Sequence, residues 1–249
     1  FSNSFEITGT TSGSSGYGIC SQRIESINIL PALGQTCTLS AYVKNTGTST
    51  VNVSVEVYRA NSTDNFSGLT LLTSLTGQAI TTSWNRITFP SFTVTDACAT
   101  GLEVRIFRYD ASNNQEWLLT GVQLEVGSSA SDFEFLPQDV NKQRCFRYYY
   151  RSVVESNGIG FFCSMPNAAL ACVHQFPAIM RAVPTMGYGW TSAYTGNTWV
   201  DLITGSVATW TLTQNQVGRE GVKNIYDNSK SGYTVGRHFG THMEADAEL

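Results

Sequence analysis

The chain has 249 residues and a formal net charge of −4, and only 14 % of its residues are charged. Lysine and arginine form no basic cluster that could neutralise phosphates, which argues against nucleic-acid binding. No run of about 18 apolar residues is present, so we expect no membrane insertion. Glycine, serine, threonine and asparagine recur throughout the chain, which predicts an all-β protein.

Eight segments between residues 5 and 126 are predicted to form strands. The clearest is 51–57, where four valines alternate with polar residues, so one face of this strand must be buried. Eight short strands separated by turns predict an antiparallel jelly-roll sandwich. The predicted strands are 5–8, 24–29, 36–43, 51–57, 69–75, 84–89, 102–109 and 117–126.

Two tryptophans each begin a predicted strand, Trp84 and Trp117. Either ring could stack on a sugar, but a tryptophan at the start of a strand more often lies in the core or at its rim. The connection 109–116 holds several oxygen ligands of the kind that calcium prefers, yet it lacks the spacing and the glycine of a helix-loop-helix calcium site. We therefore expect a solvated loop there.

A break at Gly127-Ser128-Ser129 ends the last strand of this series and predicts a domain boundary. Downstream, Pro137 suits the first turn of a short helix. We predict a first domain at 1–130, a linker with a short helix at 131–144, and a second β-rich domain at 145–249. Strands in the second domain are expected at 160–164, 169–175, 207–213, 221–226 and 233–239.

The second domain opens with an aromatic run that follows Cys145. In a strand, the aromatic and arginine side chains of this run would cover both faces. A small domain has difficulty burying both faces of such a strand, so we predict burial between identical subunits. The predicted interface contains Phe146, Tyr148, Tyr149 and Tyr150.

A second aromatic group lies among glycines and small polar residues in the segment 188–199. Aromatic planes beside short hydrogen-bonding side chains suit the faces and hydroxyls of saccharides, and loops on a β scaffold often carry recognition. Packing against the sheet or a neighbouring subunit is the alternative. The predicted receptor contacts are Tyr188, Trp190, Tyr194 and Trp199.

Three segments resemble one protein family, in the order in which the family has them. They are GVQLEVGSSASDFEF followed by CFRYYYR at the domain boundary, FPAIMRAVPT at 176–185, and ADAEL at 245–249. The family comprises tail-fibre and related virion proteins of tailed bacteriophages, in which a carbohydrate-binding-module-like jelly roll is joined to a C-terminal fibre domain.

The resemblance implies a homotrimer on the exterior of a virion, with other virion proteins and a host surface glycan as partners. It also implies a structural role for Arg181, either in anchoring a loop or in a contact between subunits. A capsid-attached fibre or a decoration protein would look similar in sequence, so this alternative stays open.

The sequence contains no nucleophile elbow, phosphate-binding loop or other catalytic motif with supporting context. His238 and His242 have a spacing that zinc could use, but the glutamate of a metalloprotease motif is absent. The six cysteines lack paired metal spacing, and free thiols are the expected state, with disulfides as the alternative. We therefore predict a protein without enzymatic activity, cofactor or metal. The alternative from another class is a glycan-cleaving enzyme with an accessory sugar-binding module.

Overall fold

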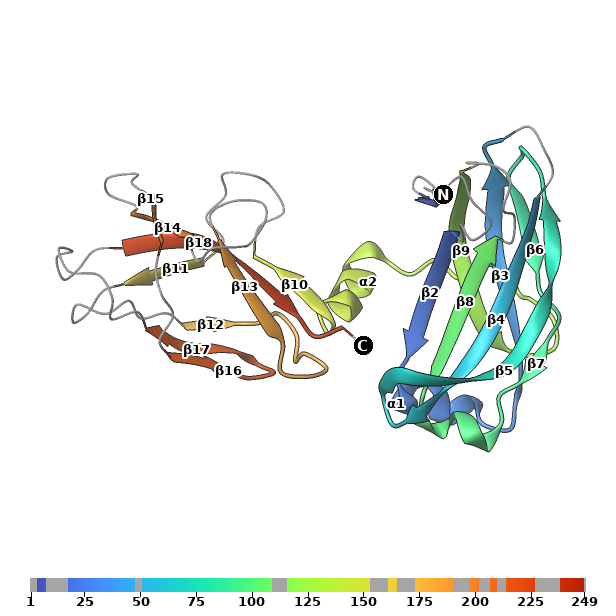
Figure 1. Ribbon diagram of the computed structural model, residues 1–249, viewed down its shortest axis with the longest axis horizontal. Coiled ribbons are helices and arrows are strands. Elements are labelled where there is room, and N and C mark those ends of the chain that lie inside the picture. The colour runs from blue at the N-terminus through green and yellow to red at the C-terminus, as the bar shows by residue number, and fades with distance from the viewer. Residues whose placement is uncertain are drawn as a thin grey trace. The chain divides into compact units, whose positions relative to one another are not determined.

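The computed structural model describes residues 4–7, 18–47, 51–108, 116–152, 161–164, 173–189, 198–201, 207–209, 214–226 and 238–248. The chain forms two compact units, 1–135 and 136–248, and the division between Phe135 and Leu136 lies within the predicted linker. Strands dominate both units (Figure 1), and the strand pairs that the structure describes are antiparallel. The predicted all-β class is confirmed.

Two sheets build the first unit, and we call them sheet A and sheet B. Sheet A contains, in spatial order, β1 (Phe5–Ile7), β9 (Trp117–Val126), β3 (Thr36–Asn45) and β6 (Asn85–Thr88), and β7 (Phe92–Thr93) also pairs with β3. Sheet B contains β2 (Gly18–Ile24), β8 (Leu102–Arg108), β4 (Val51–Ser62) and β5 (Asn65–Ile80). The connections include α1 (Ser26–Ile29), η1 (Leu30–Ala32) and η2 (Asp96–Thr100).

The strand order of these sheets is that of a jelly roll. Since β6 and β7 both pair with β3, they count as one interrupted strand and leave eight strands in all. When the eight strands are numbered along the chain, the strands of sheet A lie in the spatial order 1-8-3-6, and those of sheet B lie in the order 2-7-4-5. Two antiparallel sheets with these crossovers contain the paired Greek keys of the jelly-roll fold. The predicted jelly-roll sandwich is therefore confirmed.

The core lies between the two sheets, where alternate residues of each strand meet. Val53, Val55 and Val57 are fully buried, as the alternation in β4 predicts. Trp117 is also a core residue, with 1 % of its surface exposed, whereas Trp84 is 42 % exposed just before β6. The core interpretation of Trp117 is thus confirmed.

The predicted strand at 24–29 is wrong, because β2 ends at Ile24 and the chain turns into α1. The backbone nitrogen of Ser26 donates a 2.6 Å hydrogen bond to Asp64, and the Ser26 hydroxyl donates to the same carboxylate. This carboxylate satisfies a donor that the first turn of a helix leaves without a partner. Pro31 then suits the first turn of η1.

After β9, the segment 127–135 folds back over the outer face of sheet A. The Ser131 hydroxyl and backbone nitrogen donate to the carboxylate of Glu125, and the Glu134 nitrogen donates to the Gln123 side chain at 2.9 Å. Arg86 donates to the Ser131 carbonyl. Ser40, which faces outward beneath this segment, is only 1 % exposed. The segment therefore covers this part of sheet A.

In the second unit, most of the described strands pair around one long C-terminal strand. This strand, β18 (His238–Asp246), pairs with β10 (Tyr149–Arg151), β11 (Phe161–Ser164), β13 (Thr185–Gly189) and β14 (Thr198–Asp201), and β15 (Val207–Thr209) pairs with β14. A separate sheet has the order β12 (Val173–Gln175), β17 (Gly221–Tyr226), β16 (Gln214–Val217). Met243, Ala245 and Ala247 are buried, so the chain end contributes to the core.

The aromatic run is not the strand that the sequence predicts. Helix α2 (Gln138–Cys145) continues through Cys145, and the next three residues turn, with the Tyr148 nitrogen donating to the Cys145 carbonyl at 2.9 Å. Only Tyr149–Arg151 pair with β18. Phe146, Tyr148 and Tyr150 therefore do not share one strand face, because helical hydrogen bonding extends into the run and overrides its β propensity.

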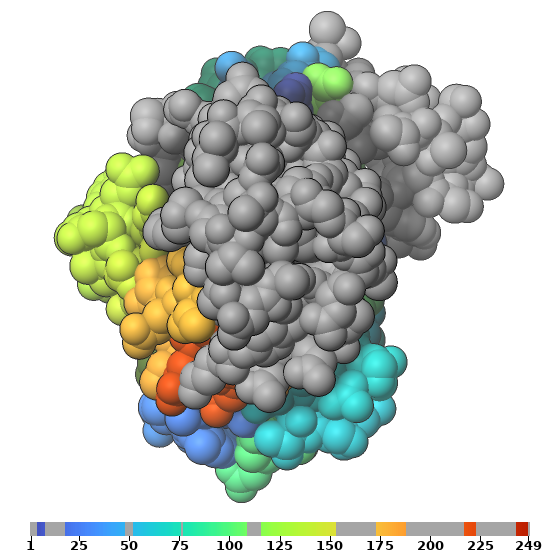
Figure 2. Space-filling model, turned by 90° about the vertical axis from the view of Figure 1, so that its left-hand side faces the viewer, coloured from blue at the N-terminus to red at the C-terminus, as the bar shows by residue number. Residues whose placement is uncertain are grey.

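Helix α2 has no buried residue. Its side chains lie open at the surface, in the yellow-green part of the space-filling view (Figure 2). An eight-residue helix of this kind gains little from propensity alone, because short helices depend on packing for their stability.

Candidate functional site

Two rows of outward-facing side chains cross all four strands of sheet B. Cross-strand neighbours on the same face of a sheet lie close enough to interact directly. One row contains Ser21, Arg105, Glu56 and Ser74. The other row contains Arg23, Glu103, Tyr58 and Leu71. We call these eight residues the sheet B platform.

Glu103 lies at the centre of the sheet B platform and joins two arginines. Arg23 Nε donates to one carboxylate oxygen at 3.0 Å, and Arg105 Nε donates to the other at 2.5 Å. The pairing with Arg105 is local, since residues two apart in a strand point to the same face. Glu103 is 1 % exposed, and a buried carboxylate needs such partners to remain charged. The two bonds fix both guanidinium groups on the outer face.

Arg105 also covers the ring of Tyr58. The guanidinium carbon lies 4.4 Å from the ring centroid, which is a close cation–π contact. The Tyr58 hydroxyl donates a 2.6 Å hydrogen bond to Glu56. This bond, followed by burial, raises the pKa of Tyr58, so the phenol stays protonated. Burial acts to lower the pKa of Arg105. The hydrogen bond to Glu103 and the negative charge of Glu103 outweigh the effect of burial, so the pKa of Arg105 is raised overall.

The sheet B platform is open to solvent at both ends of its rows. Ser21 on β2 and Ser74 on β5 are exposed, and Leu71 is 49 % exposed. The platform therefore presents a guanidinium group stacked on an aromatic ring, beside carboxylate and hydroxyl groups. Such a combination can pack against the apolar face of a pyranose ring and form hydrogen bonds with its hydroxyls.

The sequence could have indicated this platform, although our predictions did not name it. Residues 102–106 alternate between apolar and polar side chains, which places Glu103 and Arg105 on one face. Tyr58 continues the outward positions of the valine-rich strand. The missing information was the pairing of β8 with β4, which only the topology supplies.

The predicted receptor contacts are only partly described. Tyr188 lies in β13 opposite Met243, and Trp199 lies in β14 opposite Ala208. The structure does not describe the side chains of either residue, and Trp190 and Tyr194 lie outside the described residues. The assignment of these four residues to a receptor contact stays a prediction.

The predicted interface residues of the second unit are described and are half-buried. The rings of Phe146 and Tyr150 meet edge to face at 5.6 Å, and Tyr150 stacks on His174 at 5.5 Å. Tyr148 and Tyr149 are likewise half-buried. These contacts use part of each aromatic surface within one subunit, and the contact between subunits stays a prediction.

Arg181 lies in an irregular segment between β12 and β13, as the surrounding prolines predict. Its backbone nitrogen donates a 2.7 Å hydrogen bond to the Arg147 carbonyl. The neighbouring Met180 is fully buried, and its backbone exchanges hydrogen bonds with Arg219. The backbone of Arg181 therefore contributes to anchoring the loop.

Other predicted features concern cysteines, metals and membranes. Cys20, Cys37, Cys98 and Cys145 carry free thiols, as predicted for these positions. The described residues contain no cluster of three or more metal-binding side chains, and the side chains of His238 and His242 are not described. Among the described helices, none is long and apolar enough to cross a membrane.

Comparisons with known proteins give similarity at the level of fold. No protein-family model and no curated protein matches the chain. A solved CBM4 structure is 18 % identical over 49 % of this chain and 70 % of its own, with a TM-score of 0.38. A second module of the carbohydrate-binding family 16 is 20 % identical over 49 % and 75 %, with a TM-score of 0.32.

A third solved structure, the tandem CBM22-1–CBM22-2 domain of Paenibacillus barcinonensis Xyn10C, aligns with 99 % of this chain. It is 13 % identical over 87 % of its own length, with a TM-score of 0.35. All three structures are named as carbohydrate-binding modules.

Proposed function

We propose that the first unit is a carbohydrate-binding jelly roll that binds saccharide on the sheet B platform. The observation that carries this proposal is the stack of Arg105 on Tyr58, which is held in place by Glu103 and Glu56. A prearranged platform loses little side-chain entropy when a ligand binds, so more of the contact energy contributes to affinity.

Sheet A is the weaker candidate, because the chain itself occupies part of its outer face. The polar side chains Gln123 and Glu125 already bond to the segment 127–135. On sheet B, the ends of both rows are exposed, and the face combines an aromatic ring with charged groups. This difference favours sheet B as the binding face.

For the whole chain, the proposal is a non-enzymatic structural protein of a tailed-bacteriophage virion that forms a trimeric tail fibre. The sequence resemblance at the domain boundary, at 176–185 and at 245–249 supports it. Three identical subunits would give a weak glycan site useful avidity on a densely decorated host surface. A capsid-attached fibre or decoration protein is the alternative, and labelling of intact particles distinguishes the two locations.

Several features of the second unit support self-association. Helix α2 has no buried residue, and three aliphatic side chains near the anchored loop are exposed. Apolar side chains that a monomer leaves in water are stabilised when a second copy covers them. The exposed aliphatic residues are Val173, Ile179 and Val183.

The test of the binding face is a glycan array, followed by titration of the glycans that the protein retains. Tyr58→Ala removes the ring beneath Arg105, and we expect binding to weaken about two- to tenfold, since aromatic contacts are worth about 0.5–1.5 kcal/mol beyond the area they bury. Trp84→Ala is the matched control, because Trp84 is also exposed but lies outside the platform.

Equal affinity of the Tyr58→Ala variant and the unmodified protein would reject the sheet B platform as the binding face. Chain length of the polysaccharide is followed in the same incubations. Shortening of the polysaccharide that disappears on replacement of acidic residues would favour the glycan-cleaving alternative.

A further inference from the structure

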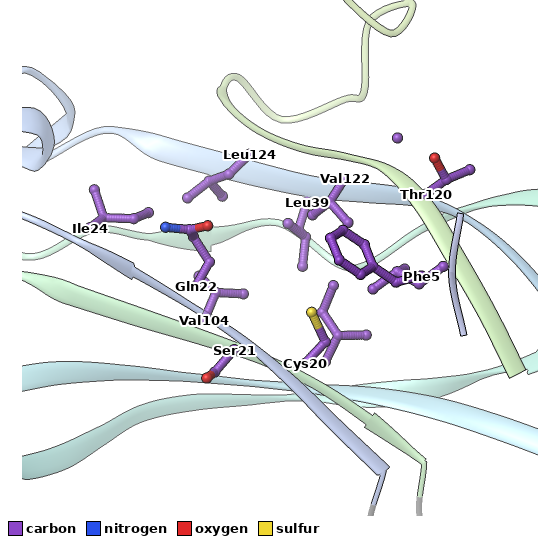
Figure 3. A pocket seen from close by; sticks show the side chains of 13 residues that line it. Phe5, Cys20, Ser21, Gln22, Ile24, Leu39, Val104, Thr120, Val122 and Leu124 are labelled. Carbon is purple, nitrogen blue, oxygen red and sulfur yellow. The ribbon is translucent and has the colours of Figure 1, made fainter. Parts of the chain in front are cut away.

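A pocket opens between the edges of the two sheets of the first unit, and we call it the edge pocket (Figure 3). It exists because β1 pairs with β9 only at Trp117–Leu119, although β9 continues to Val126. Its volume is about 310 Å³. The walls are the core-facing side chains Ile24, Leu39, Val104, Ile106, Leu119 and Leu124.

The edge pocket is suited to an aliphatic group and not to a sugar. An apolar cavity of about 150 Å³ stays dry and takes up benzene, and this pocket has about twice that volume. Sugar hydroxyls would lose their hydrogen bonds with water against such walls, at a cost of several kcal/mol (about 2–7 for each unpaired group). The few polar lining residues include Gln22 and Thr120.

One strand separates the edge pocket from the sheet B platform. Strand β2 is the edge strand of sheet B, and its side chains alternate between the two sides. Cys20, Gln22 and Ile24 line the pocket, and Ser21, which also borders it, belongs with Arg23 to the platform rows. Figure 3 shows Gln22 directed across the pocket and Ser21 on the opposite side of the same strand.

The short distance between the two sites allows one ligand to use both. Neighbouring strands are about 4.7–4.9 Å apart, so the width of a single strand separates a polar surface from an apolar pocket. A ligand that crosses the exposed Ser21 edge can place a saccharide on the platform and an attached aliphatic group in the pocket.

We propose that the ligand of the first unit is a glycan that carries an aliphatic group, such as an acyl chain. This inference rests on the proposed function, because the saccharide part occupies the sheet B platform. The edge pocket supplies the additional selectivity. It favours an acylated or alkylated saccharide over the same saccharide without the chain.

The experiment compares octyl and methyl glycosides of glucose, galactose, mannose and N-acetylglucosamine, each below the micelle concentration of the octyl compound. Binding to the full chain is measured by calorimetry. Each buried methylene strengthens binding about fourfold, so we expect the octyl glycoside of the recognised sugar to bind at least tenfold tighter than the methyl glycoside.

Two variants separate the contributions of the pocket and the platform. Leu124→Phe fills the edge pocket, and we expect it to remove the octyl advantage while the methyl glycoside binds as before. Val122→Phe narrows the same pocket from another position on β9 and provides a second test if Leu124→Phe fails to fold. Tyr58→Ala should weaken both glycosides.

Cys20 provides a readout that needs no mutation, because its thiol lies in the edge pocket. The octyl glycoside should slow alkylation of Cys20, measured by mass spectrometry of its peptide, and the methyl glycoside should not. Equal affinity of both glycosides would overturn the inference and leave the proposed function intact. Octyl binding that does not respond to Tyr58→Ala would also overturn it. Absence of binding by every glycan tested, including those on the array, would reject the proposed function itself.

Discussion

Replacing Glu103 with glutamine keeps the shape of the side chain but removes the negative charge between Arg23 and Arg105. The Glu103 side chain is 2 % exposed, whereas the two arginine side chains are 40 % and 30 % exposed. Breaking a fully buried ion pair costs about 3–5 kcal/mol, and an exposed pair contributes at most about 1 kcal/mol. Since these pairs are buried on the carboxylate side only, we expect a loss of about 2 kcal/mol in the free energy of unfolding.

The assay is urea unfolding followed by hydrogen-exchange mass spectrometry of peptides from β8. These peptides report the first unit separately, which matters because a chain with two units does not unfold in a single step. Glu56→Gln is the matched control. Glu56 is half-buried and accepts the hydrogen bond from Tyr58, and a glutamine oxygen can still accept it.

If Glu103→Gln lowers the free energy of unfolding by less than about 0.5 kcal/mol, the ion pairs of Glu103 with Arg23 and Arg105 contribute no more than ordinary surface pairs. This result would refute the argument that Glu103 holds the two guanidinium groups in position. An equal loss in the Glu56→Gln control would refute it as well, because the effect would then not depend on the buried charge.

Three further predictions concern the backbone of the first unit and the stability and association of the second. Gly101 has φ +120°, and a Cβ there would lie 2.9 Å from the Phe66 ring, so Gly101→Ala should cost about 2 kcal/mol. Gly34 has φ +72°, and a Cβ there would have no atom within 4 Å, so Gly34→Ala should lower the free energy of unfolding by less in the same urea assay. Burial lowers the pKa of His174 below its ordinary value of 6.5. The folded second unit therefore binds this proton less readily than the unfolded chain, and stability that is complete above pH 6.5 should fall in acid. The His174→Gln variant should lack this part of the pH dependence of the urea midpoint. Sedimentation should show a trimer at micromolar concentration, and Val183→Asp should dissociate it without loss of β structure; a monomeric unmodified protein would contradict the proposed assembly.

The fold of the first unit could be predicted from sequence wherever the signal was local. Four alternating valines fix both the strand at 51–57 and its buried face, because side-chain direction in a strand alternates with every residue. The strand predicted at 24–29 does not form, because α1 begins there and is capped by the carboxylate of Asp64, which lies 38 residues beyond Ser26 in the sequence. No pattern within the segment carries that information.

The sheet B platform could likewise be predicted only in part from the sequence. Glu103 and Arg105 could be placed on one face by alternation alone, but the contact of Arg105 with Tyr58 depends on the pairing of two strands that are distant in sequence. The strand prediction for the aromatic run after Cys145 failed because of its immediate neighbour in the chain, helix α2. Its residues favour a strand, yet the helical hydrogen bonds of α2 continue as far as Tyr148.

The bonds of the segment 127–135 to sheet A determine how the first unit meets a mechanical load. A pull transmitted along the chain from residue 136 reaches Glu134 and Ser131 before it reaches β9. These bonds end on Gln123 and Glu125, which are themselves residues of β9, so the load enters the ladder between β9 and β3 at these side chains as well as through the main chain at Val126. Traction on the linker is therefore shared among several points of β9 for as long as these bonds hold.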